Sequence, residues 1–335
     1  MSDNYVVIRL GSLGDVLLTT GVLGYWYETR GWRFHVVTRS GFSGIFKHHP
    51  AVREVLPVSP HQLTARGWWD FCRGLEKTHS SMELIDLHVN LRTAFLRHVW
   101  TAKVRSYPKL GLGRRIYAKT GLSAFKKRLI EKNVPQRYAA ALSQGVPDQS
   151  VLTPRLYLKP GEVLDAEKRL AGLGLGGKII CLHPYATHQA KAWPSEKWIQ
   201  LIDLLEAKGL DWIVIGQNRP PFLASNPRDL TNQTSIRETG AIIRKCRTVI
   251  TGDSGPMHLA SAAGTPVIGL FGPTSREWGF YPSGPRDILI ESDLSCRPCS
   301  LHGKAPGKCA AKCMHVLEPE LVINALNKIK SSTLS

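Results

Sequence analysis

The sequence predicts an α/β protein made of two doubly wound domains in tandem, each a parallel sheet with helices on both faces. The length of 335 residues corresponds to about two domains of roughly 150 residues. Short apolar segments alternate with helical segments in both halves of the chain, as in βαβ units. Residues 144–161 are rich in proline and glycine and read as the linker. We therefore expect domains over residues 1–155 and 156–335, facing a cleft.

The first half supplies four strands and three helical segments. A β-branched run over residues 5–10 ends at Gly11 and predicts the first strand, and residues 14–27 predict the helix that follows. The remaining pattern predicts strands over residues 33–38, 52–58 and 82–86 and a helix over residues 90–100. Residues 112–144 are expected to be mainly helical and basic.

The second half repeats the alternation after the linker. Strands are expected over residues 178–182, 211–215, 248–251 and 266–271, and helices over residues 195–207, 235–245, 255–263 and 320–330. Ligands of doubly wound sheets bind beyond the carboxyl ends of the strands. The loops that follow these strands are therefore where functional residues are expected.

The composition excludes several classes of protein. Hydrophobic residues make up 43% of the chain, which supports sizeable cores and excludes a disordered protein. No apolar run approaches the roughly 18 residues that a membrane-spanning helix needs. The N-terminus has no basic start, and Arg9 interrupts its short apolar run, so we expect a cytoplasmic protein without a signal peptide.

The positive charge is concentrated in one segment. The chain carries 44 Lys+Arg against 26 Asp+Glu, and thirteen basic residues with one acid, Glu131, lie between Arg92 and Arg137. Such a run is most often a solvated surface, but it also suits a surface that meets nucleic acid, phospholipid or an acidic saccharide. Nucleic-acid binding remains only a remote alternative, because no recognition-helix or aromatic-basic RNA motif is present.

The first candidate site is the junction after the first strand, RLGSLGDV over residues 9–16. Its G-x-x-G-D spacing lacks the dinucleotide fingerprint G-x-G-x-x-G, so nicotinamide chemistry is not favoured. Asp15 falls in the first turn of the predicted helix. It is either an acid that stabilises the helix dipole or a general base aimed into the cleft.

Two further junctions lie in the second half. LHPYATHQAKAWP over residues 182–194 offers the Thr187 hydroxyl and the Lys191 charge, which suits a phosphate. TGDSGPMHLA over residues 251–260 opens a helix whose free N–H groups at Ser254 and Gly255 would face an anion. A solvent-facing lysine and simple helix capping are the structural alternatives. Three such junctions together favour a nucleotide-sugar cleft.

Four segments, taken together, resemble glycosyltransferase family 9, the ADP-heptose:lipopolysaccharide heptosyltransferases. IRLGSLGDV at residues 8–16 resembles the N-terminal motif of the family, and AKAWP at residues 190–194 is similar to its lysine–tryptophan–proline motif. DSGPMH at residues 253–258 is similar to its aspartate–hydroxyl–glycine–x–x–histidine motif, and GTPVIGLFGPT at residues 264–274 also fits. The segments occur in the order of the family and span nearly the whole chain.

The resemblance implies a GT-B fold of two Rossmann-like domains, the first binding the acceptor and the second the nucleotide sugar. It implies inverting, metal-independent transfer of heptose from ADP-heptose to the lipopolysaccharide inner core, with no required cofactor. Carried over by position, Asp15 is the catalytic base, and the donor-binding residues are Thr187, Lys191, Asp253, Ser254, Gly255 and His258. A family 9 enzyme that uses another nucleotide sugar or acceptor is the alternative.

The implied acceptor, Kdo-lipid A or a heptosyl glycolipid, is acidic and lies at a membrane surface. The basic segment, and Arg114 and Arg115 within it, are therefore candidates to bind the acceptor or to hold the protein at the anionic inner face of the inner membrane. The chain departs from the family pattern after Gly216. The family usually places an acid near the ribose there, whereas this chain has none before Asp229, which leaves the identity of the nucleotide open.

Four cysteines near the C-terminus form a separate pattern. Cys296, Cys299, Cys309 and Cys313 have spacing compatible with tetrahedral zinc. Reduced thiols packed in a loop are the expected state, and a structural zinc is the alternative. Disulfides are disfavoured by a reducing compartment. Relatives of the heptosyltransferase type often show a similar cysteine-rich loop, so the feature fits the resemblance.

Overall fold

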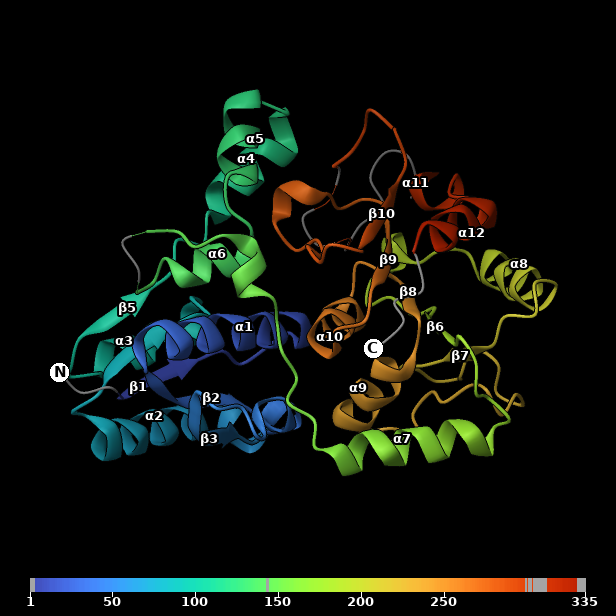
Figure 1. The fold of residues 1–335 in the computed structure, drawn as a ribbon. Coiled ribbons are helices and arrows are strands. Elements are labelled where there is room, and N and C mark those ends of the chain that lie inside the picture. The colour runs from blue at the N-terminus through green and yellow to red at the C-terminus, as the bar shows by residue number, and fades with distance from the viewer. Residues whose placement is uncertain (1–3, 143–144, 299, 301–302, 304–311, 330–335) are drawn as a thin grey trace. The chain divides into compact units, whose positions relative to one another are not determined.

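The computed structural model describes residues 4–142, 145–298, 300, 303 and 312–329 (Figure 1). The chain divides into two compact units, Met1–Lys109 with Val134–Tyr157, and Leu110–Asn133 with Leu158–Ser335. Each unit contains one parallel five-stranded sheet, so the predicted α/β class is confirmed. Chain order predicts that residues 110–133 belong to the first domain, whereas their contacts lie within the second unit.

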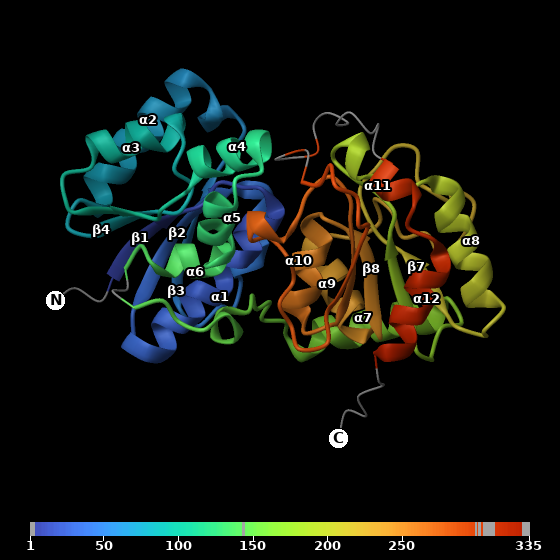
Figure 2. The same ribbon diagram turned by 90° about the horizontal axis from the view of Figure 1, so that it is seen from above.

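The sheet of the first unit has the strand order β3-β2-β1-β4-β5. Its strands are β1 (Asn4–Ile8), β2 (Arg33–Arg39), β3 (Val52–Val58), β4 (Glu83–Asp86) and β5 (Val104–Ser106). The helices of this unit are α1 (Leu13–Arg30), α2 (Ala65–His79), α3 (Leu91–Val99) and α6 (Val134–Ala139), with short 3-10 turns η1 (Ser40–Phe46), η2 (His61–Leu63) and η3 (Gln149–Leu152). Helix α1 covers one face of the sheet and α2 and α3 cover the other (Figure 2).

The core of the first unit fills both faces of its sheet. Trp26 of α1 packs on Phe34 of β2 with ring centroids 5.6 Å apart. On the other face, Trp68 and Cys72 of α2 join a buried cluster with Ile8 of β1. The sequence pattern did not predict α2. A Cβ at Gly67 of this helix would lie 2.5 Å from the His61 carbonyl oxygen, so close packing requires a glycine that helix propensity alone disfavours.

The sheet of the second unit has the order β10-β9-β8-β6-β7. Its strands are β6 (Ile180–His183), β7 (Trp212–Val214), β8 (Thr248–Gly252), β9 (Val267–Phe271) and β10 (Ile288–Glu291). Its helices are α4 (Gly111–Thr120), α5 (Ser123–Ile130), α7 (Pro160–Gly172), α8 (Ser195–Glu206), α9 (Ile236–Lys245), α10 (Gly255–Ala263), α11 (Lys312–His315) and α12 (Pro319–Lys328), with 3-10 turns η4 (Gln189–Lys191) and η5 (Arg276–Trp278). Helices α9 and α10 cover one face of the sheet, and α8 and α12 cover the other (Figure 2).

The basic segment forms a helical pair that packs on its own unit. Tyr117 of α4 and Leu129 of α5 form a small buried cluster with Trp278 of η5. The Tyr117 hydroxyl and the Lys126 ammonium both lie near the carboxylate of Glu277, at 3.5 and 3.4 Å. The pair therefore has an apolar seam, beside which Lys126 pairs with Glu277, and its exposed basic side chains include Arg115, Lys127 and Arg128.

The strand orders identify where ligands are expected. In the first sheet the order reverses between β1 and β4, and in the second between β6 and β8. The loops after these four strands hold the three junctions singled out in the sequence. In the described part of the chain, no helix combines the length and the apolar character that crossing a membrane requires.

Candidate functional site

Asp15 occupies the third position of helix α1, directly after the glycine-rich turn that follows β1. Its Oδ2 accepts hydrogen bonds from the backbone N–H and the hydroxyl of Ser12, at 3.2 and 3.1 Å. This reciprocal arrangement at a helix start satisfies N–H groups that would otherwise lack partners. The local sequence alone thus brings the carboxylate to the carboxyl end of β1, as predicted.

Arg9 is the first residue after β1 and holds the same carboxylate. Its Nη2 lies 2.6 Å from Oδ2 of Asp15, and the two side chains are only 7% and 14% exposed. Its Nη1 donates to the carbonyl oxygen of Leu87, in the loop after β4. The planar guanidinium therefore joins the loops after two neighbouring strands.

Tyr138 of α6 completes the surroundings of Asp15. Its hydroxyl donates to Oδ1 at 2.8 Å, so both carboxylate oxygens are engaged. The Arg9 guanidinium also lies over the Tyr138 ring, 5.4 Å from its centroid. This stacking and the ion pair hold Arg9, Asp15 and Tyr138 as one buried group.

The electrostatics of this group favour an ionised Asp15. Burial raises the pKa of Asp15, but the positive charge of Arg9 and the hydrogen bonds from Tyr138, Arg9 and Ser12 outweigh it, so the pKa lies below its ordinary value. For Arg9, burial lowers the pKa, but the negative charge of Asp15 and its hydrogen bond help to raise it by more, so the net shift is upward. The carboxylate is thus available to accept a proton at neutral pH.

The loop after β4 borders this group. Asp86 is fully buried and accepts hydrogen bonds from the backbone N–H groups of His88 and Val89, both at 2.8 Å. Burial, with the nearby Arg9 charge, lowers the pKa of His88 to about 3, so His88 is neutral. Lys109 donates to the carbonyl of Val89 at 2.8 Å. The site therefore holds a neutral imidazole beside the ion pair.

In the second unit, Lys191 and Asp253 form the corresponding ion pair. Lys191 closes the turn η4 after β6, and Asp253 follows β8. The Lys191 ammonium lies 2.6 Å from Oδ2 of Asp253, with both side chains largely buried. The hydroxyl of Thr274, after β9, donates to the same oxygen at 2.8 Å. Three loops thus converge on one carboxylate at the carboxyl ends of neighbouring strands.

Ser254 precedes α10 as predicted, but its side chain does not cap the helix. Its hydroxyl lies 3.0 Å from the Thr251 hydroxyl and 3.4 Å from Nδ1 of His183. Burial lowers the pKa of His183 to about 4, which keeps this imidazole neutral. The N–H groups that open α10 are therefore not taken by the Ser254 side chain, which suits an external anion.

The other predicted donor residues lie in the same two segments. Gly255 is the first residue of α10, and His258 is buried on this helix with its ring centroid 6.5 Å from that of Phe280. Thr187 is exposed in the loop between β6 and η4. The structure thus brings Lys191 and Asp253 into direct contact. The other predicted donor residues are close to one or the other of these two in the sequence.

Asp229 does not replace the acid that the family pattern places after Gly216. It is buried, and its carboxylate accepts hydrogen bonds from the backbone N–H groups of Leu223 and Thr231, at 2.7 and 2.9 Å. These contacts make it a loop-shaping residue. Gln217 and Asn218, which directly follow Gly216, are exposed.

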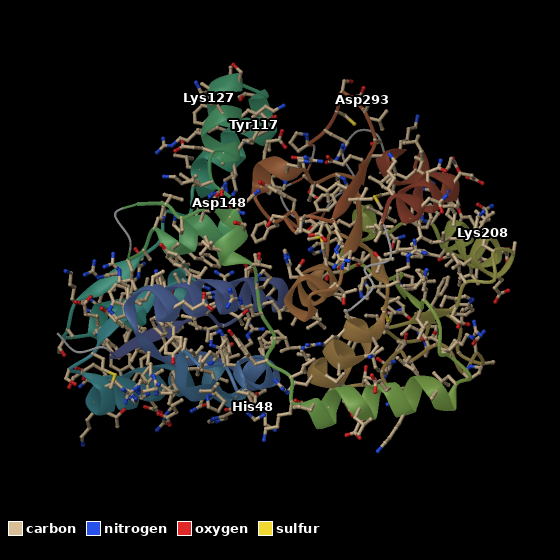
Figure 3. All side chains as sticks on the ribbon, viewed as in Figure 1. His48, Tyr117, Lys127, Asp148, Lys208 and Asp293 are labelled. Atoms are coloured by element: carbon tan, nitrogen blue, oxygen red, sulfur yellow. The ribbon has the colours of Figure 1, made fainter. Side chains whose placement is uncertain are left out.

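Arg114 and Arg115 are neighbours on α4 with different surroundings. Arg115 is exposed, whereas Arg114 is half-buried with its guanidinium 5.5 Å from the centroid of the Phe280 ring. Tyr117 on α4 and Lys127 on α5 are labelled in Figure 3, where many further side chains project from this helical pair. Arg115 is thus the better placed of the two to meet an external anion.

Two of the four cysteines of the zinc alternative belong to the described part of the chain. Cys299 and Cys309 lie outside the described residues. Cys296 is exposed, and Cys313 is buried on α11, where a Cβ on Gly272 would lie 3.2 Å from its sulfur.

The sequence pattern assigned no role to Arg9, Tyr138 or Thr274. Arg9 carried a usable signal, because a charged residue directly after a buried strand is costly unless it is paired. Thr274 lies at the end of a segment that matched the family pattern. Tyr138 carried no signal, because it reaches Asp15 from 123 positions away in the chain.

Comparisons with known proteins identify the family and the fold. The family model described as glycosyltransferase family 9 (heptosyltransferase) matches residues 84–309. The chain is 25% identical over 316 residues to lipopolysaccharide heptosyltransferase 1 of Pseudomonas aeruginosa, covering 88% of this chain and 85% of the relative.

Two solved structures are similar in fold. The Escherichia coli ADP-heptose LPS heptosyltransferase II is 17% identical with a TM-score of 0.70, covering 97% of this chain and 98% of the other. The iron-containing dodecameric glycosyltransferase TibC of enterotoxigenic E. coli is 15% identical with a TM-score of 0.62, covering 97% and 75%. These similarities confirm the predicted GT-B fold class.

Proposed function

Because this chain belongs to glycosyltransferase family 9, the heptosyltransferase family, we propose that it transfers heptose from ADP-heptose to the inner core of lipopolysaccharide. The observation that carries this proposal is the buried, ionised Asp15 held by Arg9 and Tyr138 at the carboxyl end of β1. A relative named as a heptosyltransferase matches 88% of the chain, and a solved heptosyltransferase structure is similar in fold. The acceptor is Kdo-lipid A or a heptosyl glycolipid.

Asp15 acts as the general base in an inverting displacement. A sugar hydroxyl of the acceptor is a weak nucleophile, so a carboxylate must take its proton as the new glycosidic bond forms. The bond between the anomeric carbon and the diphosphate oxygen breaks at the same time, and ADP leaves. Arg9 and Tyr138 keep the carboxylate ionised and oriented, and Oδ1, which accepts from Tyr138, keeps a second lone pair for the proton.

The Lys191–Asp253 pair and the start of α10 form the donor diphosphate site. Negative charge develops on the diphosphate as the anomeric bond breaks, and a lysine charge with backbone N–H groups stabilises it. Asp253 holds the ammonium 2.6 Å away before the donor arrives. Thr187, Ser254, Gly255 and His258 line the nucleotide-sugar pocket around this pair. Because Lys191 is a flexible point charge, it can turn from the carboxylate to a phosphate.

The basic helical pair meets the acceptor. Arg115, with the exposed basic residues of α5, provides positive charge for the carboxylates and phosphates of an inner-core glycolipid. Arg114 supports α4 against Phe280 and contributes less direct binding. The same charge holds a cytoplasmic enzyme at the anionic inner face of the inner membrane.

Transfer does not require a metal, in this proposal, because Lys191 and the α10 N–H groups supply the charge that a metal would otherwise provide. The structurally similar glycosyltransferase TibC is iron-containing, so the metal question needs a direct test. Elemental analysis and turnover are measured before and after exhaustive chelation. Full turnover without bound metal supports the proposal. Loss of turnover that returns with zinc or iron contradicts it.

The experiment that tests the function is a transfer assay with purified ADP-heptose and Kdo-lipid A. Formation of a heptosylated glycolipid and ADP is expected, with the anomeric configuration of the product, read by NMR, inverted relative to the donor. A retained configuration contradicts the role of Asp15 as base. A parallel screen of nucleotide sugars addresses the alternative that this member of the family uses another donor or acceptor, which the departure after Gly216 leaves open.

A further inference from the structure

Three potential metal ligands gather on the first unit, at the edge of the sheet opposite to Asp15. His35 lies near the start of β2, Glu54 near the start of β3, and His79 is the last residue of α2. The candidate ligand atoms of these three side chains all lie within 4.8 Å of one another. In a parallel sheet the starts of the strands lie at the opposite edge from their carboxyl ends. This group is therefore separate from the site around Asp15.

The sheet register explains why the first two ligands meet. His35 is paired directly with Glu54 across β2 and β3. Alternation along a strand places both on the face covered by α2, the face to which Val37 and Leu56 also contribute. Helix α2 ends at this point, so its last side chain reaches the same pair.

The contacts within the group have the geometry of a ligand set. Nδ1 of His35 lies 3.1 Å from Oε2 of Glu54. Ligand atoms bound to one ion at about 2.0–2.2 Å are separated by about 3.3 Å in a tetrahedron. The His35 and His79 rings lie edge to face with centroids 5.1 Å apart. The Thr78 hydroxyl lies 2.7 Å from Nδ1 of His79, and such a bond at one ring nitrogen orients an imidazole for metal binding at the other.

We propose that His35, Glu54 and His79 bind a divalent transition-metal ion of the zinc class. Two imidazoles and one carboxylate suit zinc, copper, nickel or iron(II) rather than magnesium or calcium, which prefer oxygen ligands. Glu54 is about half exposed, so its carboxylate is free to close on an ion with little rearrangement. A contact between His35 and Glu54 alone explains the positions of two of the three side chains. A bound metal ion explains why all three lie together.

The surroundings give the ion access and a structural role. His79 also lines an open cavity of about 500 Å³ between β3, η2 and α2, whose other lining residues include His61 and Asp70. The ion joins two strands and one helix that no disulfide links among the described residues, and it stabilises the folded unit through its binding free energy.

The test measures Zn²⁺ binding by the full-length, metal-stripped protein, using titration calorimetry and thermal unfolding. Wild-type protein is compared with His79→Ala and Glu54→Gln, and with His61→Ala as the control from the same cavity. We expect each ligand variant to lose one Zn²⁺ equivalent or to bind it at least ten-fold more weakly, and to lose the rise in Tm that Zn²⁺ produces. His61→Ala should behave as wild type.

Cobalt distinguishes this site from the four cysteines. Co²⁺ held by nitrogen and oxygen ligands gives visible d–d bands without the near-ultraviolet thiolate charge-transfer band, so the d–d bands should vanish in His79→Ala while any thiolate band stays. The residues proposed for heptose transfer lie at the opposite edge of the sheet from this metal site. Retained transfer activity therefore verifies that each variant is folded. Equal Zn²⁺ stoichiometry and affinity in wild type, His79→Ala and Glu54→Gln would overturn the proposal.

Discussion

The two units each place a buried ion pair at the carboxyl ends of their strands, and the charged atoms of both pairs are 2.6 Å apart. The two pairs differ in how the carboxylate is held and in the type of cation. In the first unit, Arg9–Asp15, the carboxylate is held from several sides, by Tyr138 and Ser12 as well as by Arg9. In the second unit, Lys191–Asp253, Thr274 holds the carboxylate and the cation is a lysine.

This difference indicates which partner of each pair is chemically active. A guanidinium forms several fixed hydrogen bonds, and Arg9 uses them on Asp15 and on the Leu87 carbonyl, so it serves as a support. A lysine is a mobile point charge, so Lys191 can exchange its carboxylate for a phosphate. We infer that the carboxylate acts in the first unit and the cation acts in the second. The following variants test that assignment.

Asp15→Asn should have the largest effect. The amide keeps the size of the side chain but cannot accept the acceptor proton, so turnover should fall by about 100-fold or more with little change in donor affinity. Steady-state kinetics and calorimetric titration of ADP-heptose measure the two quantities. Asp70→Asn, at an exposed position on α2, is the matched control. Turnover within a few-fold of wild type would remove Asp15 as the base.

Lys191→Met should mainly weaken donor binding. The change keeps most of the apolar stem and removes the charge, and a hydrogen bond to a charged group contributes about 1.5–3 kcal/mol, so the donor Kd should rise about 10–100-fold. Titration with ADP-heptose measures the change, and Lys208→Met on the exposed surface after α8 is the control (Figure 3). An unchanged donor Kd together with an unchanged rate would refute the role of Lys191.

Tyr138→Phe should shift the pH dependence. Removing the hydroxyl takes away one of the hydrogen bonds that lower the pKa of Asp15, so this pKa should rise. The base is ionised above its pKa, and the acid limb of kcat/KM should therefore move to higher pH. A pH profile of the variant measures the shift. In an Asp15→Asn background the same replacement should leave the profile unmoved, and a shift there would show that another group is responsible.

Arg115→Ala should have the smallest effect and act on the acceptor. One exposed basic residue near an anionic surface contributes about 1 kcal/mol, so the acceptor KM should rise about five-fold, and less at high salt. Donor affinity should not change. Arg114→Ala should instead lower Tm, because it removes the contact with Phe280. A selective loss of donor binding in Arg115→Ala would reverse the assignment of the basic helical pair.

Most of the secondary structure that positions the site followed from local pattern. The predicted strand over residues 52–58 matches β3, and the predicted helices over residues 235–245 and 255–263 match α9 and α10 closely. Helices α2 and α7 and the edge strands β5 and β10 were not identified. Strand β5 has three residues and a single apolar side chain, Val104, which is too short a pattern to separate from a loop. Residues 110–133 precede the predicted linker, so the sequence assigned them to the first domain. Their contacts lie within the second unit, because chain order does not determine which core a helix joins.

The sequence by itself determined the fold class, the family and the place of Asp15, because each follows from short segments whose patterns are local in the chain. The glycine turn, the Ser12–Asp15 cap and the strand that precedes them lie within a dozen residues. Only the tertiary structure decided what surrounds that carboxylate. Tyr138 arrives from α6, and Leu87 arrives from the loop after β4. A pKa is set by burial and by charges a few ångströms away in space, and no local pattern in the chain encodes those distances.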